Sequence, residues 1–556
     1  MDSLPVWPNL AAMMLGRARE WGAKPLLRHH AAGGWVGTSW AAFAARAARL
    51  ARGLRAAGIA PGDRVVLCSE NRPEVLIAEV ALMAFGAVPV PAYTTYLPAN
   101  YAHLIQDCAP RAAIVSTRQL GERVAEGARL AGAGLRVWGI EAGAGEPFAA
   151  LEAEPAEPAA LLAEAGQIAP DQLACLIYTS GTGGSPRGVM VPHRVILADM
   201  RGGFELVRPL RFQDELYLSF LPMSHAYEHM IGGFFAPSLG VEIAYGRGAE
   251  HLAADMQAVR PTIMTVVPRI LEVIRGRVLA AVARGPAWRR RVFDEALAAG
   301  LRGLDGGATL RDRALAPLYA RLVHRALRDR FGGRLRAMMS GGARLDPEVE
   351  RFYLALGMLV MQGYGQTEAG PAISANTLGA ARIGTVGRAL AGVELRVADD
   401  GEVLVRGETV MAGYWGQPAA TADALRDGWL HTGDVGRLDA DGFLTITDRK
   451  RDLIVLAGGE NVSPARVESA LCAEPAIEQA VVAGDGQSGL YALLVPAAGA
   501  DEGGVKQAVA RANARLAPYE RVRRHQVVPA FTLENGLLTP SHKVRRALVL
   551  RAHGAG

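Results

Sequence analysis

Glycines and hydroxyls dominate the segment Tyr178-Thr-Ser-Gly-Thr-Gly-Gly-Ser-Pro-Arg-Gly188. The segment follows an apolar run of strand type, Leu173 to Tyr178, and leads into the apolar residues Val189-Met-Val. Glycine lets the backbone approach a phosphate closely, while consecutive N–H groups, hydroxyls and Arg187 can satisfy its oxygens and its charge. The segment therefore predicts a phosphate-binding loop, with an ordinary glycine-rich turn as the alternative.

The surrounding sequence predicts an α/β fold. A Walker loop is excluded because G-x-x-x-x-G-K-[ST] is not present, and the Rossmann pattern fails because Pro186 stands where a third glycine belongs. Between residues 38 and about 120, helical apolar spacing alternates with short apolar runs such as Arg64-Val-Val-Leu-Cys. Such alternation is typical of sheets covered by helices.

Composition narrows the class of protein. The 556 residues allow about three to five structural units, and half of them are apolar. A net charge of +5 is nearly balanced, so no nucleic-acid partner is expected. The four cysteines lie far apart without a C-x-x-C pair, which fits a reducing cytoplasm. The start resembles no signal peptide, and the most apolar run, 80–92, is too short to span a bilayer.

The chain is expected to divide into a large domain, 1–450, and a smaller α/β unit, 451–556. After Asp448 the pattern changes to that of a smaller α/β unit, with a helix predicted from Ser463 onward. Before it, Val393 to Val397 and Glu402 to Arg406 are of strand type, with Asp399-Asp-Gly as the turn signal. Residues 141–166 are rich in Ala, Pro and acids, and we expect them to form a surface excursion. Residues 269–336 combine helical spacing with sixteen arginines and six acidic residues, which indicates a basic helical cap.

Two further motifs suggest groups that would face a nucleotide. In Gly363-Tyr-Gly-Gln-Thr-Glu368, an exposed carboxylate beside a hydroxyl suits Mg²⁺, which binds one or two carboxylates together with substrate phosphates. In Gly428-Trp-Leu-His-Thr-Gly-Asp434, the carboxylate could accept hydrogen bonds from both hydroxyls of a ribose, and an ordinary turn is the alternative.

With these motifs in order, the chain resembles the adenylate-forming superfamily over nearly its whole length. The resemblance implies a large N-terminal domain of several subdomains and a small mobile α+β C-terminal domain. Val267-Pro-Arg-Ile-Leu-Glu272 and Phe331-Gly-Gly-Arg-Leu resemble more specifically the long-chain fatty acyl-CoA synthetase branch. The remaining matching motifs are Leu221-Pro-Met-Ser-His-Ala-Tyr-Glu-His229, Ser340-Gly-Gly-Ala343, Asp448-Arg-Lys-Arg-Asp452 and Leu538-Thr-Pro-Ser-His-Lys543.

The resemblance implies a two-step reaction with ATP, Mg²⁺ and CoA. A fatty acid carboxylate attacks the α-phosphorus of ATP and releases pyrophosphate, and a thiol then displaces AMP. The implied nucleotide contacts are Thr179, Ser180, Gly181, Thr182 and Gly184 for the β and γ phosphates, Gly342 and Ala343 for adenine, Tyr364 and Gly365 beside it, and Asp434 and Arg449 for the ribose. The implied catalytic residues are Lys543, Glu368, which would also hold Mg²⁺, Thr367, His225 and Arg187.

Lys543 is one of only four lysines among 60 basic residues. A compact ammonium can sit between two anions where a flat guanidinium cannot, which suits the implied role of bridging the acyl carboxylate and the α-phosphate. Two positions depart from the family pattern: Gly183 replaces a hydroxyl residue, and Arg187 replaces a lysine. Because a hydrogen bond to a charged group contributes about 1.5 to 3 kcal/mol, we expect weaker or reshaped ATP binding.

Several alternatives remain open from the sequence. His225-Ala-Tyr-Glu-His229 matches the inverted zinc-protease pattern H-x-x-E-H, although no third ligand follows at helical spacing. A catalytically silenced paralogue that binds an acyl adenylate is the second alternative, and an acyl carrier protein could replace CoA as the thiol. The basic segment 269–336 could contact anionic lipid at the inner face of the membrane, meet an acidic partner or be a solvated face. Acyl chain length and oligomeric state cannot be predicted.

Overall fold

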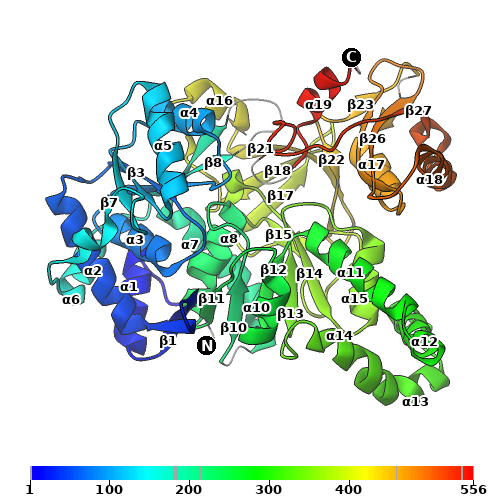
Figure 1. Cartoon of the computed structure of the whole chain (residues 1–556), viewed down its shortest axis with the longest axis horizontal. Helices are drawn as coiled ribbons and strands as arrows, with labels where there is room; N and C mark the ends of the chain where they lie inside the picture. Colours follow the sequence, from blue (N-terminus) through cyan, green and yellow to red (C-terminus); the bar gives the residue numbers. More distant parts are fainter. Residues whose placement is uncertain (1–2, 180–185, 212–213, 459, 540–542, 555–556) are drawn as a thin grey trace.

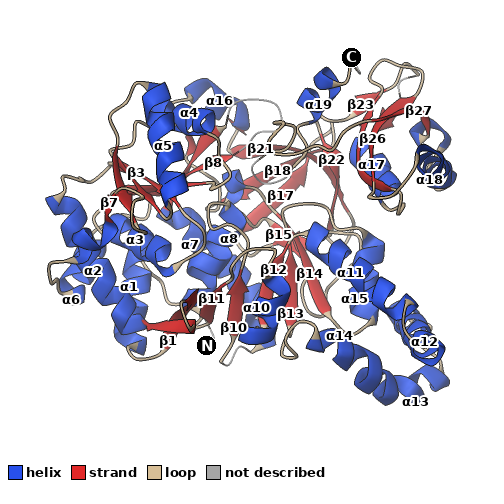
Figure 2. Cartoon of the chain, viewed as in Figure 1, coloured by secondary structure: helices blue, strands red, loops and turns tan. Residues whose placement is uncertain are grey.

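The computed structural model describes residues 3–179, 186–211, 214–458, 460–539 and 543–554. Sheets and helices alternate in layers in the large unit, and a smaller unit at the C-terminus lies to one side of it (Figures 1 and 2). The α/β class predicted from the sequence is confirmed.

A nine-stranded mixed sheet forms the centre of the large unit. The strands from β14 to β1 pair in parallel, whereas β2 pairs antiparallel with β1 at one edge, and β15 pairs antiparallel with both β14 and β16 at the other. In spatial order the strands are β16 (Arg388–Ala389), β15 (Ser374–Ala375), β14 (Leu359–Tyr364), β13 (Ala337–Ser340), β12 (Ile263–Val266), β10 (Leu216–Ser219), β11 (Glu242–Tyr245), β1 (Pro25–Ala31) and β2 (Gly34–Ser39).

A second sheet is parallel throughout. Its strands in spatial order are β4 (Val88–Ala92), β3 (Arg64–Cys68), β5 (Ala112–Val115), β6 (Arg136–Gly139) and β7 (Glu146–Pro147). Parallel sheets need both faces covered, and alternate side chains of a strand point to opposite faces. In β3, Val65 and Leu67 accordingly join one hydrophobic cluster, and Val66 and Cys68 join another.

The hydrophobic clusters show the order of the layers. The largest cluster receives one face of each sheet, so the helices that contribute to it lie between the two sheets. All residues of α3 except Glu74 are buried there, as expected for a helix that is apolar all round. The α-helices that supply most of the helical residues of this cluster are α1 (Leu10–Trp21), α2 (Trp40–Ala56), α3 (Pro73–Met83), α7 (His193–Val207), α8 (Ala226–Met230) and α9 (Ala236–Ser238).

Two outer layers complete the large unit. The outer face of the parallel sheet carries α4 (Pro98–Cys108) and α5 (Arg118–Ala131). The outer face of the nine-stranded sheet carries α10 (Leu252–Val259), α11 (Pro268–Ala283), α12 (Ala287–Leu304), α13 (Leu310–Tyr319), α14 (Arg325–Asp329) and α15 (Pro347–Ala355). Residues 269–336, called the basic arm below, are therefore helical as predicted, and α12 and α13 reach away from the sheet (Figure 1).

Two small sheets complete the large unit, and the chain passes from the second of them into the C-terminal unit. One contains the hairpin β8 (Leu173–Thr179) and β9 (Arg187–Pro192), extended by β19 (Gly413–Tyr414). The other contains β17 (Val393–Val397), β18 (Glu402–Gly407), β20 (Leu425–Arg426), β21 (Trp429–Leu438) and β22 (Leu444–Arg449), and α16 (Pro418–Ala424) lies between β19 and β20 in the chain.

The C-terminal unit has a hydrophobic core of its own, built from side chains beyond residue 453. It contains the hairpin β23 (Ile454–Val455) and β24 (Asn461–Val462), the sheet β25 (Ile477–Ala483), β26 (Leu490–Pro496) and β27 (Val522–Val527), and the helices α17 (Pro464–Cys472), α18 (Glu502–Ala514) and α19 (Arg546–Ala552). The division of the chain at residues 450 and 451 stays a prediction.

Residues 141–166 are mostly exposed, as expected for a surface excursion, but the sequence pattern did not show that part of the segment is buried. The segment adds β7 to the edge of the parallel sheet and forms α6 (Pro158–Ala165), and Phe148, Leu151 and Leu161 are buried in the inner cluster. Its apolar residues are spaced too widely to show a pattern, so only the assembled neighbours reveal the buried face.

Candidate functional site

A cavity of about 1150 Å³ opens where the hairpin β8–β9, the end of β14, the strands β21 and β22 and the C-terminal unit meet. Every predicted site residue that the structure describes lines this cavity. These residues are Thr179, Arg187, His225, Gly342, Ala343, Tyr364, Gly365, Thr367, Glu368, Asp434, Arg449 and Lys543. Ser180, Gly181, Thr182 and Gly184, together with Gly183, lie outside the described residues. The structure thus brings together residues from distant segments, while their individual roles stay predictions.

The hairpin of β8 and β9 places Arg187 opposite Thr179. The two residues are paired across the strands at the end of the hairpin that lines the cavity. The guanidinium carbon of Arg187 lies 5.3 Å from the centre of the Tyr414 ring. A guanidinium over an aromatic face is attracted to it, and this contact holds the cation at the cavity wall.

Glu368 is connected to Arg187 through Tyr414. The Tyr414 hydroxyl donates to Oε1 of Glu368 at 3.0 Å. Burial raises the pKa of Glu368, so the site favours an added positive charge next to this carboxyl. A half-buried carboxylate that lines a cavity together with Thr179 and Arg187 fits Mg²⁺, which takes few protein ligands. No cluster of three or more His, Cys, Asp or Glu side chains that could hold a metal occurs within the described ranges.

Asp434 is buried in the cavity wall and both of its oxygens have protein partners. Tyr364 donates its hydroxyl to Oδ2 at 2.7 Å, and Nε of Arg449 lies 3.2 Å from Oδ1. Burial and the charge of Asp434 raise the pKa of Tyr364, which therefore remains a donor. Tyr364 and Arg449 thus hold the Asp434 carboxylate in one orientation at the cavity wall.

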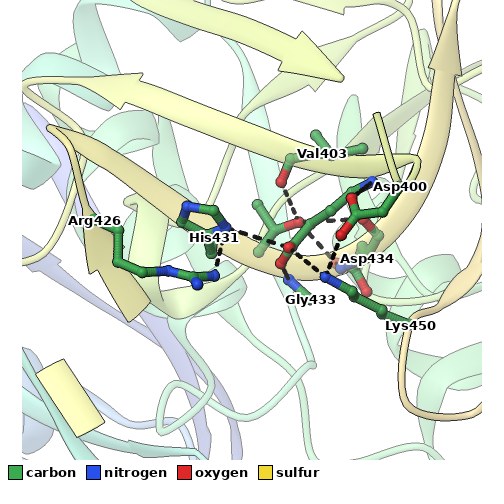
Figure 3. A network of polar contacts seen from close by, with 9 residues as sticks. Asp400, Val403, Arg426, His431, Gly433, Asp434 and Lys450 are labelled. Carbon is green, nitrogen blue, oxygen red and sulfur yellow. Dashed lines mark hydrogen bonds and ion pairs between the residues drawn. The ribbon is translucent and has the colours of Figure 1, made fainter. Parts of the chain in front are cut away.

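A polar network behind Asp434 fixes its strand (Figure 3). The Asp434 N–H donates to the hydroxyl of Thr432 at 3.1 Å, and that hydroxyl donates to the Val403 carbonyl at 2.7 Å. The neighbouring Gly433 N–H donates to Oε1 of Glu402 at 2.9 Å. Strands β21 and β18 are therefore joined by side chains at the point where β21 bulges.

Lys543 reaches the cavity from the C-terminal unit. Its side chain is exposed to the cavity, yet protein surrounds it closely enough that desolvation lowers its pKa, and the charge of Arg449 lowers it further. Asp434 and Glu368 oppose this shift. The ammonium thus lacks a close carboxylate partner among the contacts of the described residues, which suits a cation that receives an anionic substrate.

His225 faces the same space as a neutral imidazole. Burial, followed by the charge of Lys543, lowers the pKa of His225 to about 4. Its Nδ1 accepts from the Tyr227 N–H at 3.3 Å, and its ring meets the Tyr93 ring edge-on at 6.5 Å. The neutral His225 ring, packed against the Tyr93 ring, thus forms a largely apolar part of the cavity wall.

The glycines of the site permit close backbone approach. A Cβ atom on Gly365 would lie 1.7 Å from the Pro371 carbonyl oxygen, so no side chain fits there. Gly342 has a φ of 79°, a conformation that other residues rarely adopt. Both positions leave backbone groups, instead of side chains, facing the cavity.

The zinc-protease alternative is not supported by the geometry. Oε1 of Glu228 accepts from Ser219 at 2.6 Å, and Oε2 accepts from Tyr217 at 2.7 Å and from Thr265 at 2.6 Å. Nε2 of His229 lies 3.0 Å from Oε1 of Glu79 in the core. Since His225 lines the cavity instead, the two histidines and Glu228 do not converge on one point.

Sequence reasoning missed Tyr414 and Glu402. Tyr414 follows Gly413 in a two-residue strand, and nothing local marks it as a partner of Glu368. For Glu402 the sequence predicts only a place in the strand after the turn Asp399-Asp-Gly, and the structure has it at the start of β18. An acidic residue at the start of an apolar strand was the one available signal, because its burial requires a partner.

Comparison with known proteins agrees with this arrangement. The model of the family "AMP-binding enzyme" matches residues 16–415, and that of the "AMP-binding enzyme C-terminal domain" matches residues 451–554. A long-chain-fatty-acid–CoA ligase of Mycobacterium tuberculosis is 34% identical over 97% of this chain and 95% of its own. The peroxisomal long chain acyl-CoA synthetase 6 of Arabidopsis thaliana is 30% identical over 89% of this chain and 77% of its own.

Solved structures share the fold. O-succinylbenzoate coenzyme A synthetase from Bacillus subtilis, in complex with ATP and magnesium, has a TM-score of 0.73 at 22% identity and covers 96% of this chain and 98% of its own. An anthranilate CoA ligase in complex with anthranoyl-AMP has a TM-score of 0.75 at 22% identity, with coverage of 99% and 98%. The expected pairing of a large and a small domain type is thereby confirmed.

Proposed function

The chain belongs to the family of AMP-binding enzymes, and from that premise we propose that it joins a long-chain fatty acid to CoA. The reaction consumes ATP, forms acyl-AMP and releases pyrophosphate and then AMP. The observation that supports this most directly is the meeting of Glu368, Asp434 and Lys543, from three distant segments, around one cavity. The Mycobacterium tuberculosis relative, which matches over nearly its full length, is named a long-chain-fatty-acid–CoA ligase, and the Arabidopsis relative is named a long chain acyl-CoA synthetase.

In the first step an oxygen of the fatty acid carboxylate bonds to the α-phosphorus while the bond to pyrophosphate breaks. Pyrophosphate leaves with the electron pair. Lys543 lies where its charge can offset the negative charge that spreads over the transferring group. Thr367 would contact the α-phosphate, and Arg187 with Thr179 would face the outer phosphates. Mg²⁺ held by Glu368 would neutralise phosphate charge.

The nucleoside would be held by the wall opposite Lys543. Asp434, oriented by Tyr364 and Arg449, would accept from the ribose hydroxyls, and the backbone at Gly342, Ala343 and Gly365 would border the base. His225 would stand beside the acyl group as a neutral ring.

In the second step the CoA thiolate bonds to the acyl carbon, and AMP leaves with its phosphate oxygen. We place the division between a large domain, 1–450, and a mobile small domain, 451–556, at the link after β22. The separate hydrophobic core beyond residue 453 supports this division. Movement of the small domain would take Lys543 away from the cavity once acyl-AMP has formed.

A panel of carboxylates tests the function. Purified protein receives Mg²⁺, ATP and a carboxylate from acetate to oleate, and pyrophosphate release is measured with and without CoA. We expect release to rise with chain length and acyl-CoA to form only when CoA is present. If no carboxylate caused pyrophosphate release, the ligase function would be refuted. If the acyl group were transferred to an acyl carrier protein but not to CoA, the carrier protein would replace CoA as the thiol acceptor in this proposal.

We also place the protein in the cytoplasm, with peripheral contact to the membrane through the basic arm. In the part of the chain that the structure covers, no helix has the length and apolarity needed to cross a bilayer. The arm exposes large apolar side chains, Trp288, Leu310, Leu318 and Leu322, among its arginines. Exposed apolar and basic side chains together suit an anionic lipid surface.

The arm also carries a shallow cavity of about 750 Å³ whose lining includes Arg260, Arg321, Arg325 and Arg328, with Asp329 as the single carboxylate. Such a lining suits a phosphate headgroup. Co-sedimentation at low salt should show binding to vesicles of phosphatidylglycerol and none to phosphatidylcholine. Failure to bind phosphatidylglycerol vesicles would remove the membrane proposal and leave the ligase function intact.

A further inference from the structure

Lys450, one of the four lysines, lies beside the ribose-facing strand but outside every role assigned above. Its Nζ lies 2.6 Å from Oδ2 of Asp400 and 3.0 Å from Oε2 of Glu402 (Figure 3). An ammonium placed between two carboxylates is the arrangement for which a lysine is better suited than an arginine. Only four of the 60 basic residues in the chain are lysines, so a lysine instead of an arginine at this position needs a structural explanation.

The contacts of Lys450 form a closed ring with the loop before Asp434. The Lys450 side chain binds Oε2 of Glu402, and Oε1 of Glu402 accepts from the Gly433 N–H at 2.9 Å. The Gly433 carbonyl in turn accepts from the Lys450 N–H at 2.8 Å. The ring thus fixes both backbone groups of Gly433, the residue immediately before the carboxylate that faces the ribose.

Glu402 is the member of the ring that needs a cation most. It is only 4% exposed, and a buried carboxylate without a positive partner is strongly disfavoured. Burial raises its pKa, but the hydrogen bonds from Lys450, Gly433 and His431 lower it by more, so Glu402 stays ionised. Without Lys450, the remaining side-chain neighbour of Oε2 would be Nδ1 of His431 at 3.2 Å, which also lies 2.8 Å from a guanidinium nitrogen of Arg426.

Asp400 secures the other side of the ammonium. Its Oδ1 accepts from the Glu402 N–H at 3.0 Å, so the turn before β18 and the lysine hold each other. Arg449, directly before Lys450, is paired with Asp434 across β21 and β22. Loss of the Lys450 ammonium would therefore leave Glu402, which holds the Gly433 N–H, without its lysine partner, next to the strand pair that carries Asp434 and Arg449.

We propose that Lys450 is a positioning residue for ATP: through Glu402 and Gly433 it holds the Asp434 carboxylate in the orientation that receives the ribose hydroxyls. Lys450 does not touch the nucleotide in this account, because its ammonium is occupied by Asp400 and Glu402. The proposal rests on the assignment of Asp434 to the ribose in the proposed function.

The test compares ATP with 2′,3′-dideoxy-ATP in pyrophosphate release by the full chain with saturating fatty acid. We expect Lys450→Gln to raise the KM for ATP roughly 10-fold, the lower end of what a lost charge-assisted hydrogen bond produces, and to leave kcat within about twofold. With 2′,3′-dideoxy-ATP the KM of the variant should lie within about twofold of the parental value, because the hydroxyls that Asp434 would bind are gone. Glu402→Gln should give the same pattern, and Lys506→Gln, at an exposed position of α18, should change neither KM.

The outcomes separate the two proposals. An unchanged KM for ATP in Lys450→Gln, or an equal rise for both nucleotides, overturns the positioning role, since the second result reports a general structural effect. If the parental protein releases no pyrophosphate with either nucleotide, the ligase function fails first.

Discussion

The cavity and the basic arm are both rich in charge, but they hold it differently. In the cavity Asp434, Glu368 and Arg449 have defined partners at hydrogen-bond or ion-pair distance within buried or half-buried walls. On the arm, arginines such as Arg290, Arg321 and Arg328 are exposed and take part in no ion pair with the described residues.

The difference concerns how each charge contributes to function. A buried charge interacts strongly with its partners at one fixed geometry. Removing it therefore has a large effect, for which neighbouring charges do not compensate. An exposed charge interacts weakly and at many geometries, and salt screens it. The cavity should therefore respond to single substitutions in a steep and specific way, and the arm in small additive steps.

The largest effect should follow the loss of Lys543. We expect Lys543→Ala to slow acyl-AMP formation 100- to 1000-fold, because a preorganised charge at a developing anion contributes on that scale. The KM for ATP should change much less. The measurement is pyrophosphate release with fatty acid, Mg²⁺ and ATP, with Lys506→Ala as the control. If the Lys543→Ala variant accumulated acyl-AMP at the parental rate, Lys543 would contribute no more to the reaction than a charge on an ordinary exposed surface.

Glu228 gives the next largest effect, on stability. Full burial raises its pKa to about 7, although three hydroxyls donate to it. An unfolded glutamate titrates near 4.3. Between about pH 4.3 and pH 7 the native state thus keeps a proton that the unfolded state has lost, and the free energy of unfolding falls as the pH rises.

Glu228→Gln should remove this dependence, which amounts to about 3 kcal/mol between pH 4 and pH 8. Urea unfolding of the large unit at both pH values measures it, with the exposed Glu141→Gln as the matched control. If parental protein and Glu228→Gln show the same pH slope, the carboxyl is not held protonated in the core.

Asp434→Asn should raise the KM for ATP between about 10- and 100-fold, since the amide keeps the shape of the side chain and loses its charge. The Arg449 guanidinium would also lose its partner. Asp399→Asn, an exposed change in the turn before β18, serves as the control and should have no effect. Steady-state kinetics with saturating fatty acid would reveal the difference, and equal KM values in the two variants would show that Asp434 does not face the nucleotide.

Much of the local structure could be predicted, because it depends on neighbouring residues. Arg64 to Cys68 and Val393 to Val397 form strands at the predicted bounds, and Ser463 begins the predicted helix by accepting from the Arg466 N–H. The motifs also identified the residues that surround the cavity, since each motif carries its own glycines and polar groups.

The spatial arrangement could not be predicted from such patterns. The pairing of Leu27 with Ile243 in β1 and β11 joins segments far apart in the chain, and no local period reports it. Tyr414 and Glu402 matter because of what they meet after folding, Glu368 in one case and Lys450 in the other. Sequence patterns show which side chains are polar, whereas only the fold shows which of them share a buried wall.

The smallest single effects should come from the arm. We expect each of three single changes, Arg321→Gln, Arg325→Gln and Arg328→Gln, to lower the affinity for phosphatidylglycerol vesicles about fivefold, because a cation near an anionic surface contributes about 1 kcal/mol. The three changes are also combined in one triple variant. The losses should add, since no shared partner couples Arg321 to Arg328 in the described residues, and they should shrink as salt rises. Arg396→Gln removes the same charge from exposed β17 and should not change binding. A triple variant that loses no more than Arg325→Gln alone would mean that the arm holds its ligand at one fixed geometry, as the cavity does.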